Sequence, residues 1–274
     1  NIFWSGLTLS GEKTRIHSKG EATFDSEGID TARGSIDGEI RSSRLLDQLY
    51  TLLPIPELFR LKAPMSYSQG DFRWQEEKDF NLTTSFRLAG GTEGHIDVSA
   101  SPDGYGERLV LRQNGKSATI DANLRERRLD ISFKGELDLG NLRPALRYPG
   151  PLHGNVRGDY HLSMNISPFR FVESQGVMRV DDLDLPPASG SPYVRVDRIH
   201  LQGQGENISL HELRLQLNNR PIDLTGSVDI TADNNILDLK LRAGELGLKW
   251  LKTVQNMGNG GENAANMERL SRIR

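Results

Sequence analysis

Apolar and polar residues alternate one by one through most of this chain. From residue 156 to residue 166, Val156, Tyr160, Leu162, Met164 and Ile166 share one parity, with Gly158 among them, while every residue of the other parity is polar. Successive side chains of a strand point to opposite faces of a sheet, so this pattern predicts a strand with one apolar face. Similar runs lie at 82–88, 96–100, 120–124, 129–133, 222–230 and 237–241.

Turn sequences separate these runs. They are GGTEG, RQNGK, GQGEN, LNNRP and TADNN. Short Gly/Asn-rich segments between alternating runs are typical of antiparallel hairpins. The alternation changes phase in two places, between Val196 and Ile199 and between Leu210 and Leu213. A β-bulge would keep the apolar residues on one side there and would bend the strand. We therefore expect an all-β fold, a long antiparallel and strongly curved sheet.

A second pattern repeats at longer range. Gly-Glu followed by Ile or Leu begins at Gly38, Gly135 and Gly244, and each site precedes a short segment with helical spacing, at 44–53, 141–147 and 248–254. The repeat predicts modules of several strands closed by a short crossing helix. We expect entering strands at 1–37, a first module at 38–134, a second at 135–243, a closing strand and short helix at 244–254, and a polar flexible tail at 255–274.

The composition argues against several classes of function. Lys plus Arg total 34 against 37 for Asp plus Glu, and no basic block suggests nucleic acid. The chain has no cysteine, and no apolar run is long enough for a membrane helix. We expect it to be a piece of a longer protein whose anchor lies elsewhere.

No catalytic or metal-binding signature is present. The histidines are scattered without metal-ligand spacing, and the acidic stretches at 25–30 and 229–238 lack the ligand order of a calcium loop, so both are interpreted as solvated strand or turn residues. There is no G-x-S-x-G and no phosphate-binding loop, and the many Asp and Glu residues are expected on the outward parity of strands. We expect no enzymatic activity, no cofactor and no metal.

The segments GELDLGNLRPAL (135–146), GNVRGDYHL (154–162), VMRVDDLDLP (177–186), RIHLQGQGENISLHELRLQL (198–217) and PIDLTGSVDI (221–230) resemble the C-terminal regions of AsmA-like proteins. With TamB, these belong to the bacterial repeating β-groove group. The resemblance covers roughly residues 30–254 and is a pattern of Gly, Asp and alternating aliphatic residues without a catalytic motif. It implies a segment of an inner-membrane-anchored periplasmic protein that shields phospholipid acyl chains between the two membranes, with membrane contact through parts outside this chain and with envelope proteins as further partners.

The residues expected to contact lipid are the mid-strand side chains of the apolar parity. They are Phe86, Ile120, Leu124, Ile131, Phe133, Tyr160, Leu162, Met164, Leu224, Val228, Leu239 and Leu241. The alternative is a closed β-sandwich that acts as a binding or scaffold module, in which the same residues form an ordinary core. Periodicity does not distinguish the two.

Overall fold

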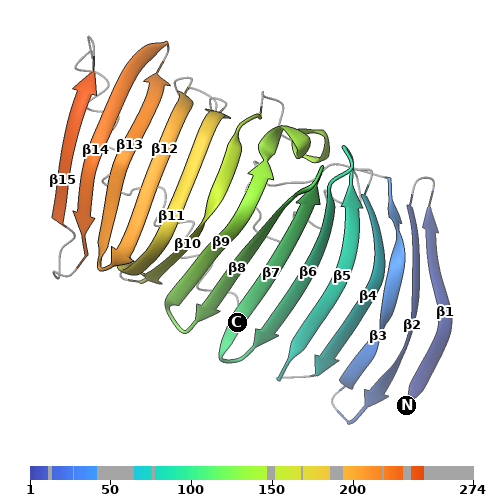
Figure 1. Cartoon of the computed structure of the whole chain (residues 1–274). Coiled ribbons are helices and arrows are strands. Elements are labelled where there is room, and N and C mark those ends of the chain that lie inside the picture. Colours follow the sequence, from blue (N-terminus) through green and yellow to red (C-terminus); the bar gives the residue numbers. More distant parts are fainter. Residues whose placement is uncertain are drawn as a thin grey trace.

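The computed structural model is one antiparallel sheet of fifteen strands, described over residues 1–11, 14–26, 28–41, 65–75, 78–146, 152–167, 169–185, 194–217, 219–230 and 236–243. The strands lie side by side in chain order, and Figure 1 shows them bent along their length, from β1 in blue to β15 in red. The expectation of a long, curved, antiparallel all-β sheet is confirmed.

The strands are eight to seventeen residues long. Their bounds are β1 Ile2–Gly11, β2 Thr14–Phe24, β3 Ile29–Ile40, β4 Met65–Gln75, β5 Phe80–Leu88, β6 Glu93–Ser101, β7 Gly104–Gln113, β8 Lys116–Arg125, β9 Arg128–Asp138, β10 Asn155–Ile166, β11 Phe169–Leu185, β12 Val194–Gly205, β13 Asn207–Leu217, β14 Arg220–Asp229 and β15 Ile236–Ala243.

Hairpin turns set the register between neighbouring strands. Between β7 and β8, Gln113 pairs with Lys116, and the two residues between them, Asn114 and Gly115, have φ of 42° and 81°. Two consecutive positive φ values give the type I′ geometry, whose twist matches that of the flanking strands. The RQNGK turn is therefore confirmed, and it fixes which side chains of the two strands share a face.

Both predicted changes of phase are bulges. The pairing of β12 with β13 shifts between Val196 and Arg198, and the pairing of β13 with β14 shifts between Leu210 and Leu213. Each bulge takes up one extra residue, so the apolar side chains before and after it stay on one side of the sheet.

The crossing after β9 consists of two short 3-10 turns, η2 Leu139–Asn141 and η3 Arg143–Ala145. The carboxylate of Asp138 accepts a hydrogen bond from Gly140 N at 2.8 Å, and Pro144 stands within the second turn. Proline lacks the N–H that a longer helix would use, which fits the short turns found here in place of a regular α-helix. No helix among the described residues is both long and apolar enough to cross a membrane.

A buried polar chain holds this crossing onto the sheet. Gln113 Nε2 donates to Thr92 Oγ1 at 3.2 Å, Thr92 Oγ1 donates to the carbonyl of Asn141 at 3.3 Å, and Asp138 N donates to Gln113 Oε1 at 3.1 Å. Below it, Leu111, Ala118 and Leu137 form a small apolar core, packed by Phe86, Leu109, Phe133, Leu139 and Leu142. The crossing thus covers one end of the sheet around β5–β9.

The predicted repeat corresponds to six strands. Gly-Glu-Ile ends β3, Gly-Glu-Leu lies near the end of β9, and β15 ends immediately before Gly244, so six strands, first β4–β9 and then β10–β15, lie between successive sites. The predicted boundaries at Gly38 and Gly135 fall inside β3 and β9, and the pairing continues across both. The residues of both predicted modules that the structure describes therefore belong to one sheet. The predicted helices at 44–53 and 248–254 and the tail at 255–274 lie outside the described residues.

The two-sheet sandwich considered as the alternative is not formed by the described strands. They belong to a single layer, and each strand makes its extensive contacts with its direct neighbours in the sheet. Within the described part of the chain, no second sheet covers either face.

Candidate functional site

One face of the sheet is apolar across all fifteen strands, and we call it the apolar face. Directly paired residues of neighbouring strands lie on the same side of a sheet, so register pairs trace the face from strand to strand. One such row begins at Phe86 in β5 and ends at Leu239 in β15. Its members are Phe86, Gly94, Leu111, Ala118, Gly135, Gly158, Met178, Leu201, Leu210, Gly226 and Leu239.

All twelve residues predicted from the sequence lie on the apolar face. Their exposure differs. Tyr160 is buried, Leu239 and Leu241 in the edge strand β15 are 42% and 47% exposed, and the other nine are half-buried. Phe86 and Phe133 pack against the core under the crossing, so these two at least partly support the fold. Contact of the twelve with lipid stays a prediction.

Aromatic side chains on this face lie across glycines of the neighbouring strand. A Cβ on Gly94 would overlap the ring of Phe86, a Cβ on Gly20 would lie 2.6 Å from Cζ2 of Trp4, and a Cβ on Gly38 would lie 2.9 Å from the hydroxyl of Tyr67. Contacts closer than 3 Å are not tolerated by real Cβ atoms, so these positions need glycine. The rings therefore lie along the sheet, over the glycines of the neighbouring strand.

Tyrosine hydroxyls add no charge to this face. Burial raises the pKa of Tyr67 to about 12, with a smaller contribution from the nearby carboxylate of Asp37. Burial also raises the pKa of Tyr160, which is partly opposed by its hydrogen bond with Ser174. Both phenols stay neutral at physiological pH.

The opposite face, which we call the polar face, carries ion pairs between strands. Lys134 Nζ lies 2.8 Å from Asp159 Oδ2, Arg214 Nε lies 3.2 Å from Asp223 Oδ1, and Arg33 pairs with Glu21. In each case the two residues are direct register partners. Exposed pairs of this kind add little stability, but they keep this face hydrated.

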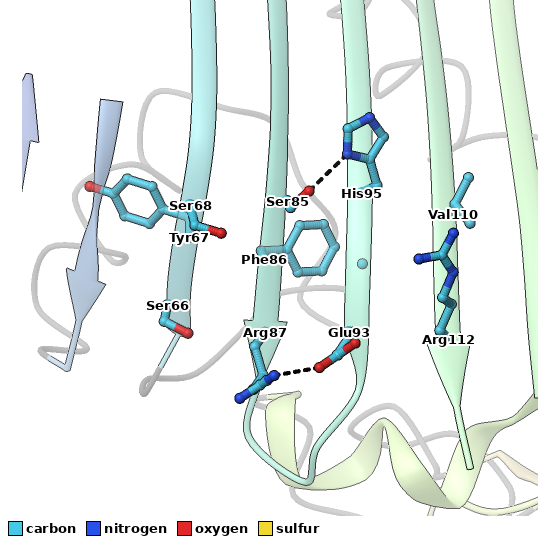
Figure 2. Close-up of a pocket in the computed structure, with 11 residues that line it drawn as sticks. Ser66, Tyr67, Ser68, Ser85, Phe86, Arg87, Glu93, His95, Val110 and Arg112 are labelled. Atoms are coloured by element: carbon cyan, nitrogen blue, oxygen red, sulfur yellow. Dashed lines mark hydrogen bonds and ion pairs between the residues drawn. The ribbon is translucent and has the colours of Figure 1, made fainter. Parts of the chain in front are cut away.

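A hollow of about 640 Å³ lies on the polar face between β4 and β7. Figure 2 shows its lining, which includes Ser66, Ser68, Ser85, Arg87, Glu93, His95, Val110 and Arg112 from the polar face. This hollow therefore lies on the side of the sheet opposite the apolar face.

Three residues near this hollow resemble a hydrolytic triad. Ser85 Oγ lies 3.0 Å from His95 Nδ1, and His95 Nε2 lies 3.3 Å from Asp97 Oδ1. However, β5 and β6 are paired on both sides, so their N–H groups bond in the sheet ladder and do not converge on a common acceptor. Ser85 and His95 link β5 to β6, His95 and Asp97 lie along β6, and the backbone of these two strands offers no oxyanion hole.

The six histidines are half-buried or exposed, and residues 231–235 of the acidic stretch 229–238 lie outside the described residues. His200 and His211 are the one close pair of histidine rings among the described residues, with centroids 4.8 Å apart, and burial followed by the charge of Arg179 lowers the pKa of His200. Asp25 Oδ1 accepts from Gly28 N at 3.0 Å in a turn. No cluster of three metal-ligating side chains occurs in the described ranges.

One charged residue in the interior of the apolar face was not predicted from the sequence. Glu107 in β7 pairs directly with Val98 and Ala122, both of which belong to that face. The signal was present, because Tyr105, Glu107, Leu109 and Leu111 share one parity in GYGERLVLRQ. The expectation that carboxylates face outward is wrong at Glu107.

Comparisons of this chain with protein-family models, with curated proteins and with solved structures find no match.

Proposed function

We propose that this protein carries acyl lipid on its apolar face, as a segment of a longer periplasmic protein that moves phospholipid between the inner and outer membranes. The observation that supports this is the continuity of the apolar face. Register partners extend it through every described strand without a second sheet covering it. The lipid identity and the placement in the envelope rest on the resemblance to AsmA-like proteins.

The energetics favour an apolar occupant. Burying one large aliphatic side chain is worth about 1.5–3 kcal/mol, and each strand presents several. Exposed apolar surfaces beyond a few hundred Å² usually mark a binding site. Acyl chains need only non-directional contact, so they match a face that offers few hydrogen-bonding groups. Contacts with the membrane and with envelope proteins would come from parts of the longer protein outside this chain.

Lipid that accompanies the protein tests the proposal. The chain is secreted into a Gram-negative periplasm, purified without detergent, and extracted for quantitative lipid mass spectrometry beside a periplasmic protein of similar mass. We expect phospholipid in stoichiometric amounts. Folded protein with no more lipid than the comparison protein would overturn the proposal and would favour a scaffold whose apolar face binds protein.

A further inference from the structure

Glu107 is the one charged side chain in the interior of the apolar face among the described register pairs. The other two charged residues of this face, Lys116 and Arg220, are the first residues of β8 and β14. Glu107 is half-buried, and its direct neighbours across β6 and β8 are Val98 and Ala122. A carboxylate therefore stands where every adjacent strand presents apolar groups.

Within the described ranges, the hydrogen-bond partner of Glu107 is a phenol. Tyr105 Oη donates to Glu107 Oε2 at 2.9 Å, and no Lys, Arg or His of those ranges forms an ion pair with Glu107. On the polar face, by contrast, the carboxylate of Asp121 in β8 has a cationic neighbour, because its Oδ1 lies 3.7 Å from Arg108 Nε in β7. An ionised carboxylate accepts several hydrogen bonds, so Glu107 has unused acceptor positions.

A lipid lying on this face would remove water from Glu107. A carboxylate taken out of water without a cation is strongly destabilised. Either the lipid avoids this position, or it brings a positive group to it.

We propose that Glu107 and Tyr105 bind the primary ammonium group of an aminophospholipid and thereby select lipids with this head group. This inference rests on the proposed lipid-carrying function. An ammonium has three donors, and the two carboxylate oxygens with the lone pairs of the Tyr105 hydroxyl offer three acceptors on one side. A divalent metal would need about six oxygen ligands, which one carboxylate and one phenol do not provide.

The position of Glu107 fits a lipid lying across the strands. It is the fourth residue of β7, about 10 Å from the strand's start at ~3.3 Å per residue, close enough to the sheet's rim for a head group to reach water. From Glu107, the row of direct partners continues to Ala122, Ile131 and Leu162. These three interstrand steps cover about 14 Å, close to the ~15 Å depth of the hydrocarbon of one leaflet.

Lipid exchange with vesicles of known composition tests the assignment. The purified chain is incubated with vesicles of equal parts phosphatidylethanolamine and phosphatidylglycerol, separated from them, and its bound lipids are quantified. Because a hydrogen bond to a charged group is worth roughly one order of magnitude in affinity, we expect about tenfold enrichment of phosphatidylethanolamine. Glu107→Gln should abolish the enrichment while total bound lipid stays the same, and Tyr105→Phe should reduce it.

The control is Glu93→Gln, which removes the same charge from the polar face, where Glu93 pairs with Arg87. It should keep the enrichment. Circular dichroism and thermal unfolding establish that the Glu107→Gln variant is folded.

The two proposals fail in different ways. Wild-type protein that binds lipid without a preference, or a Glu107→Gln variant that keeps the preference, would overturn the head-group assignment and leave lipid carriage standing. Wild-type protein that binds neither lipid would overturn both.

Discussion

The ring of Phe86 in β5 lies across Gly94, its direct register partner in β6, and fills the place that a Cβ on Gly94 would occupy. Figure 2 shows the ring turned from β5 toward β6. A side chain on Gly94 would displace this ring and disturb the core formed by Leu111, Ala118 and Leu137. The glycine therefore allows an aromatic residue to pack flat on the sheet.

We predict that Gly94→Val destabilises the protein by about 1–3 kcal/mol, the usual cost of inserting groups into packed space. Urea unfolding followed by circular dichroism measures this change. Gly6→Val in β1 is the control, because nothing lies within 4 Å of a Cβ built at Gly6. If the two variants lose equal stability, the Phe86–Gly94 contact does not explain the requirement for glycine.

Gly135 and Gly158 pair directly between β9 and β10 with φ of 124° and 154°. A Cβ on Gly135 would overlap the carbonyl oxygen of Ser117 in β8, which is backbone and cannot turn aside. We therefore predict that Gly135→Ala costs more stability than Ala122→Gly in β8, which removes only a methyl group from the same face. Thermal unfolding of both variants tests the order, and the reverse order would contradict it.

The buried polar chain under the crossing gives a third prediction. Gln113→Leu leaves the N–H of Asp138 without its acceptor and Thr92 Oγ1 without the donor Gln113 Nε2, so we expect a loss of about 1–3 kcal/mol. Hydrogen exchange at the Asp138 amide should accelerate in the variant. Arg112→Leu, a neighbour exposed on the polar face, is the control and should leave that amide protected.

Asp130 provides a pH-dependent prediction. Burial alone would raise its pKa, but hydrogen bonds from Ser163 and Arg128, with the charges of Arg128 and His161, outweigh burial and hold the pKa below its ordinary value of 3.8. A carboxylate with a lowered folded-state pKa contributes stability that is complete above pH 4 and is lost as the pH falls through that lowered value.

Asp130→Asn should therefore be less stable than the wild type at pH 7, and the difference should shrink as the pH falls below 4. Urea unfolding at several pH values between 7 and 2.5 measures this difference. A difference that stays constant over that range would show that Asp130 does not titrate as inferred.

The strands and their apolar face can be predicted from the sequence, because the alternation of apolar and polar residues is a local signal. Leu162 and Leu224 belong to the face by parity alone, and the bulges at residues 197 and 211–212 follow from a visible change of that parity. The exposure of a side chain, by contrast, is not determined by the local sequence. Leu239 and Leu241 have the same pattern as Leu162 but lie in β15, which among the described strands has a paired neighbour on one side only.

Relationships across strands need the register, which a single sequence does not provide. Phe86 and Gly94 meet because the hairpin between β5 and β6 sets their pairing, and Gln113 reaches Thr92 from a different hairpin. The position of Glu107 on the apolar face, by contrast, could be predicted from the sequence, because Glu107 has the same parity as Leu109. The expectation that carboxylates face outward assigned it to the wrong face.

The last prediction separates lipid carriage from folding. Leu162 lies mid-strand in β10, half-buried between its register partners Ile131 and Ser174, and outside the core under the crossing. Leu162→Arg places a charge on the path proposed for acyl chains, where an unpaired charge is costly only when lipid removes the water. We expect a folded variant, by far-UV circular dichroism, that retains much less lipid than the wild type. His161→Arg, one residue away on the polar face, is the matched control and should retain lipid as the wild type does. An unfolded Leu162→Arg variant would instead identify Leu162 as part of a closed core, and a folded variant with undiminished lipid would place the lipid elsewhere.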